Sequence, residues 1–431
     1  MKIRTKKLDY EQVLALPAPK RHLPKKPLSI LRGLIRALSI PDMLATKFEC
    51  STGNMESVGK KPCLILMNHS AFIDLKIAYR IFFPKPLCVV CTRDSYIGKR
   101  WLMPLIGCIP TNKFVPDITL MSDISYALHK KKANVLMFPE AGYSLDGRAT
   151  ALPERMGTLL KKLSVPVVMV SANGTFLRQP LYNELITRKV KVSATVECLL
   201  SEEDIKEKSV AEIDAIIKNA FSFDNFKNQS RDLKAIDTPD RAKGLERILY
   251  RCPKCCSEGT TVGEGTKLRC EKCGKSYELD SLGKMSACDG ETEFPEISDW
   301  VDWQRECVKQ EIINGEYRLD TEVDIRIIKD HKALYDVGRG RLVHDGNGLT
   351  LTGCEGKLEF NQPPLASHSL NVDFYWYTIG DIIGIGNKDI LYYCFVDKGI
   401  PVLKARLAAE EMYKLKKAEK RISRNRKEPI V

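Results

Sequence analysis

Short apolar runs alternate with amphipathic stretches between residues 60 and 200. The runs are brief and aliphatic, which is typical of strands. They occupy residues 63–67, 87–91, 135–138, 165–171 and 190–199. Apolar residues at helical spacing predict helices over residues 71–82, 120–131 and 157–163. This alternation predicts an α/β layer with a largely parallel, mixed sheet.

The pattern changes beyond residue 200. Residues 201–245 look helical and charged, and residues 297–313 predict another helix. After residue 317 the apolar runs are short, β-like and separated by turn residues. They lie at residues 323–328, 340–344, 349–352, 357–360, 369–376, 382–385 and 391–395. With a final helix predicted over 401–420, they indicate a small β-rich domain of the pleckstrin-like kind.

The first residues are basic and rich in proline, so residues 1–27 are expected to be irregular. Residues 28–40 predict a short amphipathic helix with arginines on a separate face. Such a helix can lie in a membrane interface or pack on the main domain. The segment 96–110 carries Trp101 between cations and apolar residues, and it suits either a buried helix or a membrane interface.

The 431 residues carry a formal net charge of +13, concentrated at the two ends of the chain. This excess favours an anionic surface, although solvated tails would look the same. Most cysteines stand singly in apolar runs, as reduced thiols do. No apolar stretch approaches 18 residues and no leader opens the chain, so no transmembrane helix is expected. We expect a cytoplasmic protein, peripheral on the inner face of a membrane.

Two of the predicted strands are followed by candidate catalytic side chains. His69 comes just after the run 63–67, with Asp74 five residues later, and Glu140 follows the run 135–138. Open α/β sheets bind ligands at the carboxyl ends of their strands. His69 could act as a general base, Asp74 could orient its ring, and Glu140 could shape an acceptor site. An isolated His–Asp pair is nevertheless more often structural.

The stretch Asn68–Asp74 matches the NHxxxxD motif of the glycerolipid acyltransferase family, the PlsC-like enzymes that acylate 1-acyl-glycerol-3-phosphate. Three further blocks follow in the family's order. They are residues 107–113, residues 138–148, which open with Phe-Pro-Glu, and residues 163–168. The resemblance covers roughly residues 45–200.

The resemblance implies a direct mechanism. His69 would take the proton of an acceptor hydroxyl while Asp74 holds the ring, and the oxygen would attack an acyl thioester. The donor would be acyl-CoA or acyl carrier protein, and the acceptor a lyso-phospholipid or related lipid alcohol. No redox cofactor is implied. The acceptor site would be formed by Asn68, Lys113, Glu140, Tyr143, Ser144 and Arg148.

Departures from the family pattern affect the acceptor site. Ala141, Gly142 and Tyr143 stand where the family has Gly, Thr and Arg, and Lys113 stands where it usually has Arg. Those two arginines are expected to bind the acceptor's phosphate in relatives. Lysine and tyrosine cannot form the paired hydrogen bonds of a guanidinium. We therefore expect weaker phosphate binding or a different acceptor, unless Arg148 or Arg93 substitutes.

Two Cys-x-x-Cys pairs lie fourteen residues apart, and they indicate a tetrahedral zinc site. The predicted ligands are Cys252, Cys255, Cys270 and Cys273. The adjacent Cys256 is expected to be a bystander, and Tyr277 suits the returning strand of a zinc ribbon. Such a ribbon is expected to be a structural module here, with nucleic acid an unlikely partner because no aromatic RNA-binding signature accompanies it.

These patterns divide the chain into five parts. They are a basic segment and helix (1–45), an acyltransferase domain (46–245), a zinc ribbon (246–283), a β-rich domain (284–400) and a basic helix and tail (401–431). Two alternative functions stay open. One is a lipid-binding or scaffold protein that has lost activity on the same fold, and the other is a nucleic-acid-associated zinc-ribbon protein.

Overall fold

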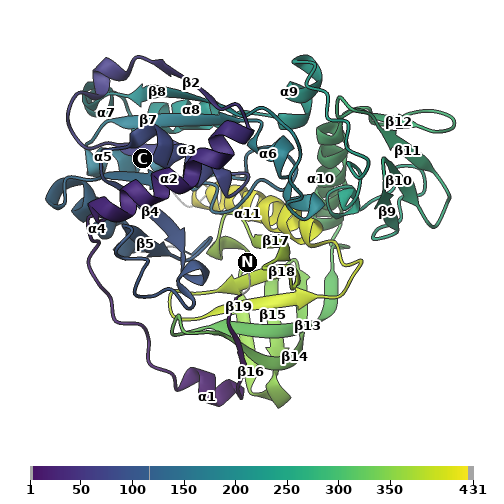
Figure 1. Ribbon diagram of the computed structural model, residues 1–431. Coiled ribbons are helices and arrows are strands. Elements are labelled where there is room, and N and C mark those ends of the chain that lie inside the picture. The colour runs from purple at the N-terminus through teal and green to yellow at the C-terminus, as the bar shows by residue number, and fades with distance from the viewer. Residues whose placement is uncertain (1–2, 116, 426–431) are drawn as a thin grey trace.

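The computed structural model describes residues 3–115 and 117–425, and it is built around three sheets (Figure 1). A seven-stranded sheet comes first in the chain, a four-stranded sheet follows, and an eight-stranded sheet comes last. Part of the expected basic tail, including Arg426 and Lys427, lies outside the described ranges. No helix within those ranges is long and apolar enough to cross a bilayer.

The seven-stranded sheet has the order β2-β8-β7-β3-β6-β4-β5. Its strands are β2 (Glu49–Gly53), β3 (Leu64–Met67), β4 (Leu87–Thr92), β5 (Cys108–Thr111), β6 (Asn134–Met137), β7 (Val167–Asn173) and β8 (Ser193–Leu200). Only the β7–β8 pair is antiparallel, so the predicted mixed sheet is confirmed. Sequence patterns missed β2, which is exposed along its whole length, and β5, which contains Pro110.

Successive side chains of β3 enter different cores because they point to opposite faces of the sheet. Leu64 and Leu66 pack in a cluster with residues of α4 (Ile118–Ser125), α5 (Met156–Leu163) and α8 (Val210–Ala220). Ile65 and Met67 pack with residues of α2 (Ser29–Ala45) and α3 (Ile73–Phe82). Helices thus cover both faces, which leaves the strand ends as the place for a site.

The N-terminal segment is more ordered than its composition predicted. Residues Thr5–Lys7 form β1, which pairs in parallel with a strand of the last sheet, and Tyr10–Leu14 form α1. The expectation of an irregular stretch over 1–27 is therefore wrong for these residues. Val13 is fully buried against the rest of the protein, so distant contacts and not local propensity order this segment.

Two other expectations fail in part. Residues 201–245 contain α7 (Glu202–Glu207), α8, α9 (Asn225–Arg231) and the first residue of a 3-10 helix (Leu245–Arg247), and residues 232–244 form no helix. The segment 97–107 is a series of turns, so a buried helix there is wrong. Trp101 in that segment is 72% exposed.

The four-stranded sheet is antiparallel, with the order β12-β11-β10-β9. Its strands are β9 (Thr261–Glu264), β10 (Lys267–Cys270), β11 (Ser276–Leu279) and β12 (Met285–Ala287). The predicted returning strand near Tyr277 is β11. Figure 1 shows this sheet projecting beside α10 (Ile297–Ile313), a helix whose bounds agree with the sequence prediction.

The last sheet has the order β16-β15-β14-β13-β19-β18-β17, with β1 beside β14. Its strands are β13 (Leu319–Ile328), β14 (Leu334–Asp345), β15 (Gly348–Gly353), β16 (Leu358–Gln362), β17 (Asn371–Trp376), β18 (Gly380–Gly386) and β19 (Leu391–Val396). The predicted β-rich character is confirmed. The final helix, α11 (Val402–Asn425), contacts α10, β17 and β18 and lies between the two large sheets (Figure 1).

One continuous apolar core joins the three parts. It includes Leu145 and Phe176 from the first part, Tyr277 from the four-stranded sheet, Trp300 from α10 and Leu403 from α11. Phe176 lies in the short helix α6 (Thr175–Arg178). The β-rich part therefore packs directly on the part that carries the His–Asp motif.

Candidate active site

His69 and Asp74 lie in contact at the carboxyl end of β3. Nδ1 of His69 is 3.0 Å from Oδ2 of Asp74. The same oxygen accepts hydrogen bonds from the backbone N–H groups of Ser70 and Ala71, at 2.6 and 2.9 Å. Asp74 is fully buried in the first turn of α3, and these donors fix its carboxylate. When Nδ1 carries the proton toward Asp74, Nε2 is left as the basic nitrogen of the ring.

Aromatic side chains hold the imidazole from two sides. Phe138 stacks on His69 with ring centroids 3.8 Å apart, and Tyr143 meets the ring edge-on at 4.5 Å. The His69 side chain keeps 19% of its surface exposed. The ring is thus oriented by packing as well as by Asp74, and it stays accessible to a reactant.

Glu140 links two backbone segments of the site through its carboxylate. Its two carboxylate oxygens accept hydrogen bonds from the backbone N–H groups of His69, at 3.0 Å, and of Thr150, at 3.1 Å. The side chain is fully buried, and burial raises its pKa to about 8 although both backbone donors act to lower it. Glu140 therefore ties the end of β3 to the loop after β6.

Asn68 and Ser144 also face the backbone. Asn68 donates to the carbonyl of Ala172 at 2.9 Å and accepts from its N–H at 2.7 Å, which links β3 to β7. Ser144 donates its backbone N–H to the carbonyl of His69 at 2.8 Å. Both side chains are buried, so these residues hold the positions of the strand ends around His69.

Arg148 is occupied by acidic partners. Its Nε and Nη2 donate to Asp146, at 3.0 and 2.8 Å, and its Nη1 donates to Asp302 at 2.6 Å. Arg93 donates to the backbone carbonyl of Lys388 at 3.3 Å. The hydrogen bonds of these two guanidinium groups within the described residues thus join them to Asp146, Asp302 and Lys388, and not to Tyr143 or Lys113.

Lys113 and Tyr143 lie where the β-rich part meets this edge of the sheet. Nζ of Lys113 is 3.5 Å from Oδ2 of Asp373 in β17, and both side chains are 13% exposed. Burial, and after it the charges of Asp74, Asp373 and Asp94, raises the pKa of the Tyr143 hydroxyl. Residues of the C-terminal part therefore belong to the surroundings of His69.

Sequence reasoning missed three charged residues near the site. Asp94 follows β4 as His69 follows β3, so a polar residue after a buried run was a usable signal. Asp373 and Arg406 carried none, because they come from the distant elements β17 and α11. Arg406 is buried, and its Nε lies 3.4 Å from Ser369 and 3.5 Å from Glu410.

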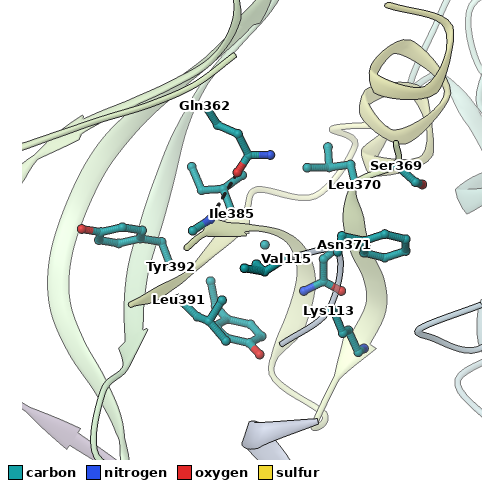
Figure 2. Close-up of a pocket in the computed structure, with 13 residues that line it drawn as sticks. Lys113, Val115, Gln362, Ser369, Leu370, Asn371, Ile385, Leu391 and Tyr392 are labelled. Atoms are coloured by element: carbon teal, nitrogen blue, oxygen red, sulfur yellow. Dashed lines mark hydrogen bonds between the residues drawn. The ribbon is translucent and has the colours of Figure 1, made fainter. Parts of the chain in front are cut away.

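Two cavities lie near the C-terminal part. One of about 20 Å³ lies between residues 113–115 and strands β17 to β19, with Lys113 and Asn371 at its wall (Figure 2). Another of about 200 Å³ separates residues 145–151 from α10 and α11, and its charged lining is Asp146, Arg148, Asp302, Arg305, Arg406 and Glu410. The first has room for about one water. His69 lines neither of them.

The four predicted cysteines converge at the tip of the four-stranded sheet. All four sulfurs lie within 4.8 Å of one another, and the Cys252–Cys273 and Cys255–Cys270 pairs are each 3.7 Å apart. Zn–S bonds of about 2.3 Å would place tetrahedral sulfurs about 3.8 Å apart. The cluster therefore has the geometry to hold a metal ion. Cys256 is exposed and lies outside it.

Comparisons with known proteins match the region that carries the His–Asp pair. Residues 49–172 fit the family model described as Acyltransferase. The chain is 28% identical over 130 residues to "1-acyl-sn-glycerol-3-phosphate acyltransferase BAT2, chloroplastic" of Brassica napus, a match covering 28% of this chain and 36% of that protein. It is 28% identical over 137 residues to a 1-acyl-sn-glycerol-3-phosphate acyltransferase of Saccharomyces cerevisiae, covering 30% and 44%.

A solved structure gives a weaker likeness. The 1-acyl-sn-glycerophosphate (LPA) acyltransferase PlsC of Thermotoga maritima has a TM-score of 0.34 at 16% identity, covering 44% of this chain and 80% of that chain. The matched region contains the His69–Asp74 pair at the carboxyl end of β3. The family model covers residues 49–172, less than half of the chain, and with the two relatives it supports the resemblance that the order of the motifs predicted. The match spans less than half the length of either curated relative.

Proposed function

We propose that this protein transfers a fatty acyl group from an acyl thioester to the hydroxyl of a lyso-phospholipid or a related lipid alcohol. The donor would be acyl-CoA or acyl carrier protein, and 1-acyl-glycerol-3-phosphate is the acceptor named for the relatives. The observation that carries the proposal is the 3.0 Å contact between His69 and Asp74 within a region of the acyltransferase family.

In this mechanism Nε2 of His69 takes the proton of the acceptor hydroxyl as its oxygen attacks the thioester carbon. Asp74 stabilises the imidazolium that forms. The C–S bond then breaks, and the departing thiolate leaves as a thiol after taking the proton from His69. General-base catalysis of this kind is typically worth ~10²–10⁴-fold in rate. Asn68, Glu140 and Ser144 would keep His69 in place, while Lys113 and Tyr143 would face the acceptor.

We further propose that the cysteine cluster holds one structural zinc ion. The sulfur spacing and the four-thiolate ligand set fit Zn²⁺, which prefers closed tetrahedral sites of this kind. The ion would cross-link the two turns of residues 252–255 and 270–273. The ribbon then forms a rigid unit that packs through Tyr277 on Trp300, with ring centroids 4.9 Å apart.

A peripheral membrane contact, on the cytoplasmic face, completes the proposal. Exposed apolar side chains gather on α2 and nearby loops, and the start of α2 bonds to the turns through Leu28 and Leu105. These exposed apolar residues are Leu28, Ile30, Leu34, Leu38, Ile40, Leu44, Phe72 and Trp101. Arginines and lysines lie between them in sequence, which suits an anionic lipid surface. Phe72 is three residues from His69, so a docked membrane would present its lipids near the ring.

The C-terminal strands and α11 would form a pleckstrin-like domain. Support comes from the sheet order, in which the first strand β13 lies beside the last strand β19, and from one helix after the last strand. We also propose the division of the chain into five parts. These parts share one apolar core and pack as one unit.

The test is an acyl-transfer assay on the purified chain with acyl-CoA or acyl carrier protein and a panel of lyso-phospholipids. Ester formation with stoichiometric release of thiol is expected from the wild type and not from a folded His69→Ala variant. The proposal fails if the folded wild type acylates none of the panel. It also fails if His69→Ala keeps the wild-type rate, and the inactive scaffold on the same fold would then be favoured.

A further inference from the structure

Four candidate groups share one edge of the seven-stranded sheet. His69 follows β3, Glu140 follows β6, Asp94 follows β4 and Lys113 follows β5. These strands are parallel neighbours, so their carboxyl ends lie side by side. Asp94 and Lys113 are thus on the same edge as the His–Asp pair, on the side where β17 packs.

The charge of Lys113 is already matched inside the protein. Its Nζ pairs with Asp373 at 3.5 Å in a contact that is largely shielded from water. The same Nζ lies beside the third block, because a Cβ placed on Gly142 would be 3.9 Å from it. This is the position where the resemblance expects cations for the acceptor's phosphate. A phosphomonoester reaching Lys113 would meet the Asp373 carboxylate as well.

Asp94 has an oxygen without a partner. Its Oδ2 accepts a hydrogen bond from the hydroxyl of Tyr377 at 3.2 Å, four residues beyond Asp373. Its Oδ1 has no hydrogen-bond partner among the described residues, although Asp94 is only 7% exposed. A buried carboxylate oxygen is costly unless a donor binds it. Oδ1 of Asp74 at the same edge also has no partner within the described part of the chain, and a donor on a bound molecule would satisfy either oxygen.

The carboxylates of Asp94 and Asp373 affect a residue that contacts His69. Both Asp94 and Asp373 act on the hydroxyl of Tyr143, whose ring contacts the imidazole at 4.5 Å. Lys113 pairs with Asp373, and the described residues give Asp94 no ion pair. Arg406 is the other cation near enough to act on Asp373, and Glu410 lies 3.5 Å from its Nε. Where the resemblance expects cations, this site also holds the two carboxylates Asp94 and Asp373.

Resting on the acyl transfer proposed above, we propose that the acceptor of this protein carries an ammonium group in its head group. Asp94 Oδ1 accepts a hydrogen bond from that ammonium group, and Asp373 keeps Lys113 from binding a phosphomonoester. A cationic head group satisfies the buried carboxylate, whereas a phosphate dianion is repelled by two acidic side chains. Asp94 and Asp373 are then the residues that determine acceptor specificity.

Three lyso-lipids with one acyl chain test this: lysophosphatidylethanolamine, lysophosphatidylglycerol and lysophosphatidic acid. The wild type should show kcat/KM at least about tenfold higher for the ethanolamine lipid than for lysophosphatidic acid. Asp94→Asn should remove most of that preference through KM. Asp373→Asn should raise kcat/KM for lysophosphatidic acid alone, because Lys113 becomes free. Asp381→Asn, a carboxylate on β18 paired with Arg247, should leave all three values unchanged.

Binding separates this inference from the acyl-transfer proposal. Dissociation constants for the same lipids are measured with His69→Ala, alone and combined with Asp94→Asn or Asp373→Asn. The same order of preference is expected without turnover, so a chain that binds in this order but never transfers acyl groups would defeat only the proposed function. Tightest binding of lysophosphatidic acid would overturn the inference. An equal gain for all three lipids in Asp373→Asn would also overturn it, because Asp373 would then only block the site.

Discussion

The cysteine cluster and the His69 site are assembled in opposite ways. All four cysteines lie within 22 residues of the chain, on turns around one small antiparallel sheet. The His69 site draws on the ends of four parallel strands and on β17, more than 300 residues away from His69. The first is a local cross-link, and the second is a meeting of distant segments. Substitutions at the first should therefore change stability, and substitutions at the second should change turnover.

The largest effect is expected from Asp74→Asn. An amide at this position can no longer stabilise the imidazolium and favours the wrong tautomer of His69, so kcat should fall by about 10²–10⁴-fold. Asp224→Asn is the matched control, because Asp224 also accepts two backbone N–H groups at a helix start, those of Phe226 and Lys227. Steady-state rates measure kcat, and circular dichroism shows whether each variant is folded. A normal kcat in folded Asp74→Asn would remove the proposed role of the pair.

Cys270→Ser should have the complementary effect. Loss of one thiolate should lower the zinc content from about one ion per chain and lower the unfolding midpoint, since structural zinc contributes directly to folding. The kcat of the chain that stays folded should change little, because the cluster lies outside the His69 site. Cys256→Ser, an exposed neighbour outside the cluster, should behave as wild type. Zinc analysis and thermal melts test this, and full zinc occupancy in Cys270→Ser would contradict it.

The same contrast explains what the sequence could predict. Cys-x-x-Cys spacing and the apolar runs are local signals, so the cysteine cluster and the central strands β3, β4, β6 and β7 were foreseeable. Strand β2 is exposed along its length, and β5 contains Pro110 and is buried only at its first two residues, so neither produced a readable apolar run. Strand β1 forms only because β14 offers it an edge. Such long-range pairing leaves no trace in a local pattern.

Within the His69 site, the contact between His69 and Asp74 was predictable because five residues separate them. The contact of Lys113 with Asp373 was not, since it depends on how β17 docks on the sheet edge. The sequence showed that Tyr143 and Lys113 stand where the family pattern has arginines. It did not show what surrounds these two side chains. Arg148 was visible as a possible substitute cation, but its pairing with Asp146 and Asp302 was not.

Glu140, in the His69 site, should give a smaller effect, which is a pH dependence of the free energy of unfolding. Burial raises the pKa of Glu140 from 4.5 to about 8. Between these values the folded chain holds a proton that the unfolded chain lacks, so this residue's stabilisation falls as pH rises through the window. The slope is at most about 1.4 kcal/mol per pH unit. Glu140→Gln should lose that slope in urea melts between pH 5 and 9, and parallel curves for both proteins would refute the assignment.

The smallest effect is expected on vesicle binding, and it compares the outer surface of the His69 region with that of the cysteine region. Trp101 is 72% exposed in the turns of residues 97–107, whose Leu105 accepts a hydrogen bond from Leu28 before α2. Leu233 is 74% exposed and precedes the Ile236–Ser281 hydrogen bond on the ribbon side. If the His69 region faces the membrane, Trp101→Ala should weaken binding to anionic vesicles by about three- to tenfold, because an interfacial aromatic is lost. Leu233→Ala should leave binding unchanged. Equal losses in both variants would mean that apolar exposure alone drives adsorption. Such a result would give no evidence that the His69 region approaches the lipid more closely than the cysteine region does.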